Sequence, residues 1–504
     1  LKEIIDYTSH YDFHPPLQYL INKITLQLFG LNEFWLSLPS IIFIILAIIL
    51  AGRLIFMLTG SYKYSLLSSF IIASNPLILL WGSSIRWYPL WTFLAVISIY
   101  TLIKLFSQVK KTRSIILKCI LTITLTFSLY LNYQTITLMA SFIIAALILD
   151  LKDKKGNYFY LKLLTPVIAG VIVLFIPYMG IFLNHLETFF LRKEIFSGYS
   201  GSSVFISGGY FLFSVLFGNS IYPWDIRFII LFILALAAGV ALVIYFKTIY
   251  SYSLKTYLQA FLTEEQIKSH YTLGFITTSL FLLFLIQSLI SGSVPGRGLM
   301  VLLVLFIIVT TVTVYYLFRS KNIRLSFLIS ICALSFFLIW SMGSYNVFVK
   351  QSIHKAGLMD PVREVVELVN NIENTKKENV VVITYDPVLT YYLAKSESYK
   401  NLTIFSPYIK ESSKLLVSVN VSGYHRSVDF DSTATLIYIQ SYPGSLIPLK
   451  ERLDILNSYI LNAGVMIKSP TKLGLDSDAM MKRRFFPSAD ILDWRYTITV
   501  FSPK

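Results

Sequence analysis

The side chains best suited to chemistry lie close together near the start of the chain. Two aspartates and two histidines fall within nine positions: Asp6, His10, Asp12 and His14. A carboxylate near a hydroxyl can act as a general base, and a histidine beside a carboxylate is a common metal site. The pattern therefore predicts either a catalytic or metal-binding centre, with Asp12 and His14 as its catalytic pair, or an ordinary solvated loop.

Two arginines stand at the ends of apolar segments. Arg86 lies in the stretch Ser83–Pro89, and Arg297 lies in the stretch Gly292–Gly298. Because a guanidinium binds phosphate through two parallel hydrogen bonds, both arginines are candidate phosphate clamps. The alternative is that each simply extends to lipid headgroups. Asn132, in a short loop between apolar runs, is predicted either to hydrogen-bond a substrate or to cap a turn.

The composition indicates that these residues belong to a polytopic α-helical membrane protein. Of the 504 residues, 55% are hydrophobic and 14% are charged, which is too apolar for a soluble protein. Apolar runs of about 18–20 residues recur along the first two thirds of the chain, and each is long enough to cross a bilayer. About ten spans are predicted: Phe34–Leu58, Tyr64–Leu80, Trp87–Phe106, Ile115–Leu131, Tyr133–Leu149, Leu163–Leu183, Phe228–Phe246, Leu273–Ile290, Leu299–Phe318 and Leu325–Trp340. Before them, apolar residues at helical spacing predict a surface helix over Leu17–Phe29, just after two prolines that forbid helix.

The distribution of charge predicts which way the chain faces. The net charge of +16 does not indicate nucleic-acid binding, because most of its Lys and Arg residues lie in short loops between spans. Basic loops of this kind stay in the cytoplasm. They alternate with the loops that hold His14, Arg86, Asn132 and Arg297, so these candidates are expected on the extracytoplasmic face of the plasma membrane. The long loop Asn184–Arg227 lies on the same side and is expected to be a flap or a connector.

The character of the sequence changes after Trp340. We expect residues 1–343 to form a transmembrane domain with outer juxtamembrane loops, and residues 344–504 to form a soluble extracytoplasmic α/β domain. A helix is predicted over Asp360–Asn374 and a strand over Val380–Thr384. Further helices are predicted at Val388–Ala394 and Leu449–Ala463, and further strands at Leu436–Gln440 and Tyr496–Phe501. No Gly-rich phosphate loop follows these strands, so nothing in the sequence indicates a nucleotide site.

The segment from Asp12 to Ser40 resembles a known family of membrane enzymes. Its motifs are Asp12-x-His14-Pro15-Pro16-Leu17-x-Tyr19, Phe29-Gly30-x-Asn32-Glu33-Phe34 and Leu38-Pro39-Ser40. They are similar to the first outer loop and second span of the dolichyl-phosphate-mannose–protein mannosyltransferase-like superfamily. The resemblance implies a membrane glycosyltransferase of the GT-C fold, which takes a sugar from a polyprenyl-phosphate carrier. Gln18 departs from the pattern, because relatives usually have Tyr there.

Weaker resemblance extends over essentially the whole chain. The motif positions that match are Arg86, Tyr88 and Arg297, and those that depart are Ser84, Ile85, Asn132 and Gly298. The resemblance implies a substrate-binding set of Arg86, Tyr88, Asn132, Arg297 and Tyr19. Relatives also carry a catalytic Asp-Glu pair in the first outer loop, so the main catalytic carboxylate is expected upstream of Leu1. In the related lipid A aminoarabinose transferases an acidic metal ligand occupies the position of His14, which implies His14 as a ligand or a substrate contact.

The sequence thus predicts an enzyme that works in the lipid bilayer on a polyprenyl-phosphate-linked sugar. Its acceptor is a protein, a lipid or another glycan, and a divalent metal is the one candidate cofactor. Two alternatives stay open. A lipid-sugar flippase would be expected to show inverted repeats, and the sequence has no internal repeat. A non-catalytic membrane scaffold would explain the departures from the family motifs.

Overall fold

The computed structural model of the chain divides into two compact units, Leu1–Ser352 and Ile353–Lys504. The structure describes residues 15–30, 33–107, 111–153, 158–186, 213, 216–217, 225–249, 264–291, 300–319, 323–348, 362–375, 380–384, 402–406, 416–418, 435–441, 466–467, 471–475 and 494–502. The predicted site residues Asp12, His14 and Arg297 lie outside these ranges, as do the predicted helices at 388–394 and 449–463.

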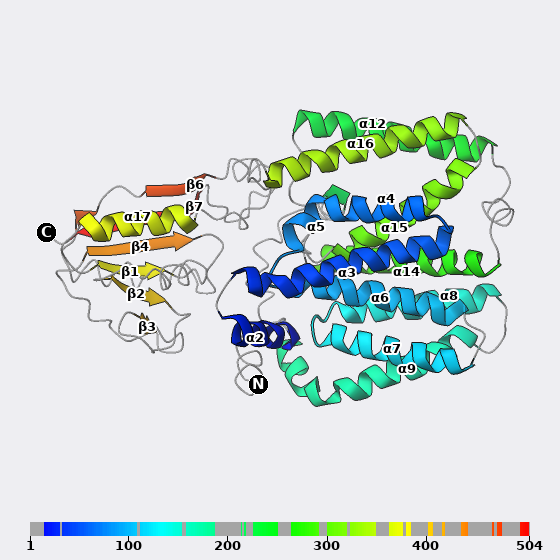
Figure 1. The fold of residues 1–504 in the computed structure, drawn as a ribbon, viewed down its shortest axis with the longest axis horizontal. Helices are drawn as coiled ribbons and strands as arrows, with labels where there is room; N and C mark the ends of the chain where they lie inside the picture. The colour runs from blue at the N-terminus through cyan, green and yellow to red at the C-terminus, as the bar shows by residue number, and fades with distance from the viewer. Residues whose placement is uncertain are drawn as a thin grey trace. The chain divides into compact units, whose positions relative to one another are not determined.

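The first unit is built from helices that lie side by side (Figure 1). Their bounds are α2 Leu17–Phe29, α3 Glu33–Thr59, α4 Tyr62–Ser74, α5 Pro76–Trp81, α6 Tyr88–Ser107, α7 Lys111–Leu129, α8 Thr135–Asp153, α9 Phe159–Phe175 with a 3₁₀ turn at Ile176–Tyr178, α12 Ile226–Ile249, α14 Glu264–Ser291, α15 Met300–Arg319 and α16 Ile323–Phe348. Together they form a helical membrane unit whose helix ends carry the candidate site residues.

Seven helices in the described part of the chain are long and apolar enough to cross a membrane. They are Phe34–Thr59, Tyr88–Ser107, Thr112–Leu129, Thr135–Lys152, Phe159–Leu186, Lys268–Gln287 and Phe327–Tyr345. The predicted spans Phe228–Phe246 and Leu299–Phe318 fall on α12 and α15, whose apolar stretches Ile226–Ala241 and Met300–Tyr316 are shorter than those of the seven. The described helices therefore support a multi-pass membrane protein with seven candidate spans.

The predicted span Tyr64–Leu80 is wrong, because the chain breaks there into two helices. The first, α4, ends at Ser74, and the second, α5, begins at Pro76. Asn75 between them is extended, with φ −66° and ψ 131°, because a proline disfavours the helical conformation of the residue before it. The Asn75 Oδ1 atom accepts the backbone N–H of Leu77 at 2.9 Å and so caps the new helix.

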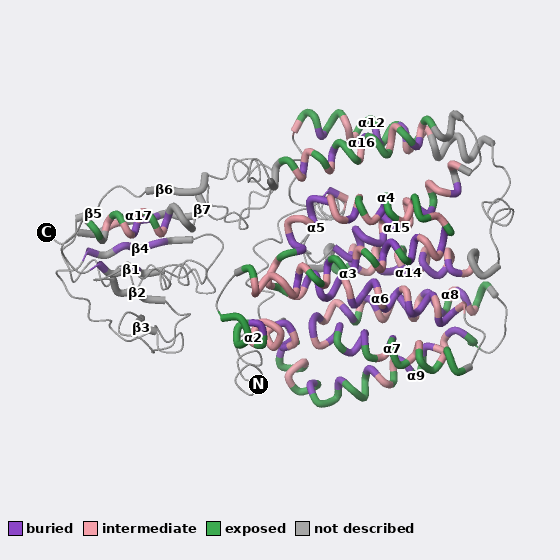
Figure 2. Tube along the Cα trace, in the orientation of Figure 1, coloured by how far each residue is buried: buried purple, intermediate pink, exposed green. Residues whose placement is uncertain are grey.

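Helix α6 forms the core of the first unit. It packs against α3, α7 and α14, and 72% of its span is buried (Figure 2). A polar side chain inside it is fully bonded: Ser98 Oγ donates to Leu94 O at 2.7 Å and contacts Thr124 Oγ1 at 2.9 Å. Buried hydroxyls of this kind need such partners because no water reaches them. Helix α6 is therefore a rigid support for the turns at its two ends.

Helix α2 has the predicted bounds, but its polar side faces the protein. Gln18 and Thr25 are buried, whereas Ile24 and Leu28 are 55% and 69% exposed. A helix at the surface of a soluble protein would turn its apolar side inward. The reversed arrangement fits a helix whose outer face contacts lipid, where apolar side chains incur no cost.

The second unit contains a seven-stranded sheet. Its strands are β1 Val380–Thr384, β2 Leu402–Ser406, β3 Leu416–Ser418, β4 Thr435–Ser441, β5 Met466–Ile467, β6 Thr471–Leu475 and β7 Trp494–Ser502. The order is β3-β2-β1-β4-β7-β5, with β6 also paired to β7. The first four strands are parallel to one another, and β7 runs antiparallel to β4. Helix α17, Val362–Thr375, precedes β1 and buries Val365 and Val369.

Candidate active site at one end of the helical unit

The start of α2 is hydrogen-bonded to two turns of the helical unit, the first at residues 82–87 and the second at residues 130–134. The backbone N–H of Leu17 donates to Tyr130 O at 3.2 Å, and Pro16 just before it is buried. One turn further along α2, Gln18 Nε2 donates to Asn22 Oδ1 at 2.8 Å, and Asn22 Nδ2 reaches Ile85 O at 3.4 Å. Segments far apart in sequence therefore meet at the helix that follows the His-Pro-Pro stretch.

The first of these turns, residues 82–87, presents Arg86. Ser40 Oγ donates to Ser84 O at 2.6 Å and so fixes the turn to α3. Arg86 is exposed, and no ion pair within the described part of the chain involves it. Tyr88, two residues later, is buried and its ring lies 5.7 Å from that of Trp81. Arg86 thus projects from a turn whose base is packed, whereas Tyr88 belongs to that base.

The second turn, residues 130–134, is built around Asn132. Its Oδ1 atom accepts the backbone N–H of Gln134 at 3.1 Å, and its Nδ2 atom donates to Gln134 Oε1 at 3.0 Å. These bonds shape the turn, which is the second of the two roles that the sequence allowed for Asn132. The Tyr130 hydroxyl donates to Leu174 O at 3.1 Å.

A buried histidine that the sequence analysis missed also contacts this turn. His185 is 2% exposed, and its Nδ1 atom lies 2.7 Å from the hydroxyl of Tyr133. The rings of Tyr178 and Phe182 lie nearby: the Tyr178 ring is 6.3 Å from the His185 ring, and the Phe182 ring is 5.0 Å from the Tyr133 ring. The one signal in the sequence was a histidine two residues after the end of an apolar run, and its tyrosine partner is 52 positions away.

A double-mutant cycle should show that Tyr133 and His185 interact. We expect the double variant Tyr133→Phe/His185→Phe to lose less free energy of unfolding than the sum of the two single variants. The difference should be about 0.5–1.5 kcal/mol, because each change alone removes the same hydrogen bond. The free energy of unfolding would be measured by titration with dodecyl sulfate in mixed micelles. The matched control pairs Tyr133→Phe with Tyr316→Phe, whose hydroxyl donates to Leu58 O at 2.7 Å elsewhere in the unit. Additive costs for Tyr133 and His185 would contradict the interaction.

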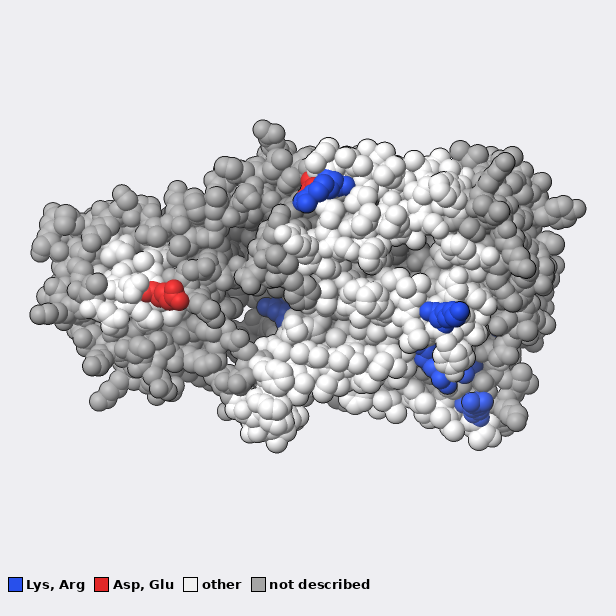
Figure 3. Space-filling view, turned by 45° about the horizontal axis from the view of Figure 1, so that its top comes forward, with Lys and Arg blue, Asp and Glu red and all other residues white. Residues whose placement is uncertain are grey.

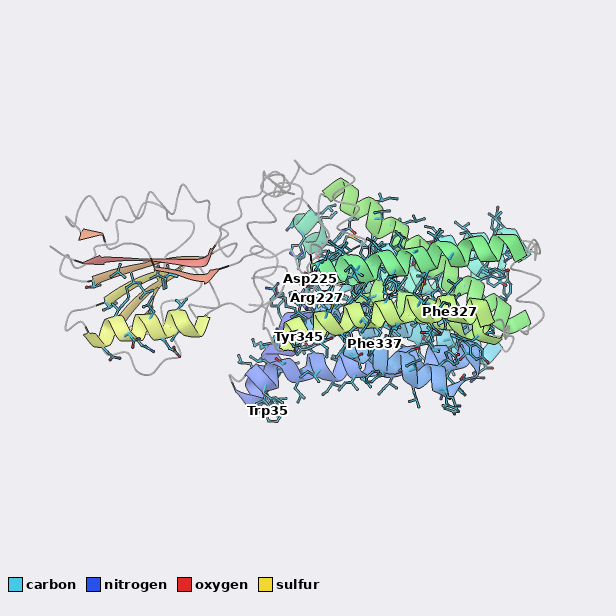
Figure 4. All side chains as sticks on the ribbon, turned by 90° about the horizontal axis from the view of Figure 1, so that it is seen from above. Trp35, Asp225, Arg227, Phe327, Phe337 and Tyr345 are labelled. Carbon is cyan, nitrogen blue, oxygen red and sulfur yellow. The ribbon has the colours of Figure 1, made fainter. Side chains whose placement is uncertain are left out.

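A second arginine at this end is already neutralised. Arg227 donates through Nε and Nη2 to the carboxylate of Asp225, at 3.0 and 2.6 Å, and Figure 4 shows both near Tyr345. The Asp225 Oδ1 atom also accepts the Arg227 backbone N–H at 2.9 Å, at the start of α12. Because its guanidinium is occupied, Arg227 is a weaker candidate than Arg86 for binding a phosphate.

The described residues include no obvious metal centre. No group of three or more His, Cys, Asp or Glu side chains comes together among them. Of the predicted site residues, the structure brings Arg86, Tyr88, Asn132 and the half-buried Tyr19 to one end of the helical unit, around α2. The predicted catalytic pair and metal ligand, Asp12 and His14, directly precede this segment in sequence.

On the face drawn in Figure 3, a group of described basic side chains lies at the opposite end of the helical unit. Lys104 near the end of α6, Arg113 at the start of α7, Lys152 at the end of α8 and Lys162 at the start of α9 all lie there, because these helices alternate in direction. Lys152 Nζ lies over the ring of Tyr271 on α14, which belongs to the same end. The two ends of the helical unit therefore differ in charge.

Comparison with solved structures identifies a protein of similar fold. No family model and no curated protein sequence matches the chain. Among solved structures, ArnT from Cupriavidus metallidurans bound to undecaprenyl phosphate matches with a TM-score of 0.50 and 11% identity, over 97% of this chain and 88% of that one. The apo state of the same ArnT gives a TM-score of 0.48. The chain therefore has the fold of ArnT, the GT-C fold.

Proposed function

We propose that the chain is a membrane glycosyltransferase that takes its sugar from a polyprenyl-phosphate carrier. The observation that carries the proposal is the exposed Arg86, free of ion pairs within the described residues, at the α2 end of a GT-C fold. The structural neighbour ArnT was crystallised with undecaprenyl phosphate, a carrier of this chemical class. A guanidinium at the boundary between lipid and water is suited to a carrier whose phosphate lies there and whose tail lies in the membrane.

In the proposed reaction, Arg86 and Arg297 hold the carrier phosphate. A carboxylate removes the proton from the acceptor hydroxyl, and Asp12 is the candidate for it in this sequence. The acceptor oxygen then forms a bond to the anomeric carbon while the bond from that carbon to the phosphate oxygen breaks, with inversion at the sugar. The departing phosphate gains negative charge, and the guanidinium stabilises it. His14 and Tyr19 are proposed to orient the sugar, while Asn132 shapes the turn at residues 130–134. His14 would be the ligand if a divalent metal takes part.

The proposed orientation puts this site outside the cytoplasm. Lys104, Arg113, Lys152 and Lys162 lie at the other end of the helical unit, and basic residues at span ends are retained on the cytoplasmic side. The α2 end and the second unit would then face the exterior of a plasma membrane. The acceptor would be a protein, a lipid or a glycan reached from that side.

The test is a transfer assay with lipid-linked sugars. The protein encoded by the whole reading frame, with any residues upstream of Leu1, would be purified in detergent. It would then be incubated with radiolabelled polyprenyl-phosphate sugars and membrane extract. We expect label to leave at least one carrier for a new acceptor. Movement of labelled carrier across proteoliposomes without transfer would favour a flippase instead. Neither transfer nor movement, in a folded protein with the whole donor panel, would contradict the proposed enzyme and favour a scaffold.

A further inference from the structure

We infer that Trp91 and Thr135 are positioning residues that hold the start of α2 in place through the turn at residues 130–134. The inference rests on the proposed function, because α2 directly follows the predicted catalytic segment. The Thr135 hydroxyl has one proton to donate and can also accept a bond. It donates to Asn132 O at 2.7 Å and accepts the indole N–H of Trp91 at 3.0 Å. Its two bonds thus join the turn to helix α6.

Both partners are immobilised by burial. Thr135 is fully buried and Trp91 almost so, and the Trp91 ring contacts those of Trp87 and Phe284 at 5.9 and 6.5 Å. An indole N–H can only donate, and in a buried site it needs an acceptor. Thr135 supplies it. The rigid core of the unit therefore determines where the hydroxyl, and with it the carbonyl of Asn132, must lie.

The other side of the same turn holds α2. The Tyr130 carbonyl accepts the N–H of Leu17, the first residue of that helix. The first N–H groups of a helix have no partner within the helix, and Pro16 at the cap position makes no side-chain bond. Tyr130 O therefore does the work of a cap, from another part of the chain. A shift of the turn would displace Leu17 and the two prolines that follow His14.

Comparing the wild type with variants of Thr135 and Trp91 distinguishes the positioning of α2 from a general effect on the stability of the helical unit. Thr135→Val keeps the shape and removes the hydroxyl, Thr135→Ser restores it, and Trp91→Phe removes the donor. Thr124→Val is the matched control, because Thr124 is a buried threonine of neighbouring α7 that bonds Ser98 instead of the turn. Hydrogen exchange would be followed by mass spectrometry in peptides that cover residues 15–22 and 128–136. Because prolines have no amide, the first exchangeable amide of a peptide that starts at Pro15 is that of Leu17.

We expect Trp91→Phe to speed exchange about tenfold in both peptides, because it loses one buried hydrogen bond. Thr135→Val should have at least as large an effect, because it loses both bonds of the hydroxyl. Thr135→Ser and Thr124→Val should match the wild type there. Where transfer is measured, Thr135→Val should lower kcat and leave the KM for the carrier unchanged, because the reacting groups move and the phosphate clamp does not.

Three results would overturn the inference: unchanged exchange in the peptide covering residues 15–22 of Thr135→Val, an equal effect of Thr124→Val, or failure of Thr135→Ser to restore protection. The exchange experiment needs no substrate. A wild type without transferase activity would therefore contradict the proposed function, while exchange alone would still decide whether the turn holds α2.

Discussion

Replacing Arg86 with alanine should weaken binding of undecaprenyl phosphate about 10- to 100-fold, and should abolish transfer. This range corresponds to the loss of one charge-assisted hydrogen bond to phosphate, which contributes about 1.5–3 kcal/mol. Folding should be unaffected, because the Arg86 side chain is exposed and makes no ion pair with the described residues. Arg86→Lys should lie between, since it keeps the charge and loses the two-pronged geometry.

The matched control for this prediction is Arg53→Ala. Arg53 is an exposed arginine of α3, on the part of that helix away from α2. Carrier binding would be measured by titration in detergent, and transfer by the radiolabel assay. Unchanged binding in Arg86→Ala, or an equal loss in Arg53→Ala, would remove Arg86 from the proposed site.

Replacing Tyr160 with alanine should destabilise the helical unit by about 3–5 kcal/mol, the usual cost of removing a large buried aromatic side chain. Tyr160 is fully buried at the start of α9. Its ring lies 5.1 Å from that of Phe106 on α6, and Lys268 Nζ on α14 lies 4.5 Å from its centroid. One side chain thus joins three helices, and the cavity that it leaves cannot be filled by a single neighbour.

Tyr158→Ala provides the comparison two residues earlier. The Tyr158 ring is 62% exposed, and its φ of 53° is equally unfavourable for tyrosine and alanine. We expect its free energy of unfolding to change by less than about 1 kcal/mol. Both variants would be unfolded with dodecyl sulfate in mixed micelles. Similar losses in the two would show that Tyr160 does not join the helices.

The hydrophobic pattern was a good guide to local structure. Helix α2 begins and ends where its apolar spacing predicted, and β1 covers the predicted run Val380–Thr384. Such features depend on a few neighbouring residues, so periodicity is enough to predict them. The error at Tyr64–Leu80 was also local, because the Asn75-Pro76 pair that ends α4 stands in the sequence.

The site depended on contacts that no local pattern contains. Leu17 bonds Tyr130, Trp91 bonds Thr135, and Tyr133 meets His185, and each pair joins different helices or turns. Likewise, α2 buries Gln18 and Thr25 and exposes Ile24 and Leu28, an arrangement that fits lipid instead of water at its outer face. The sequence by itself determined a membrane protein, its helices and the chemical types available to it. Only the tertiary structure decided which of these groups meet, because hydrogen-bond partners in a helical bundle are selected by the packing of whole helices.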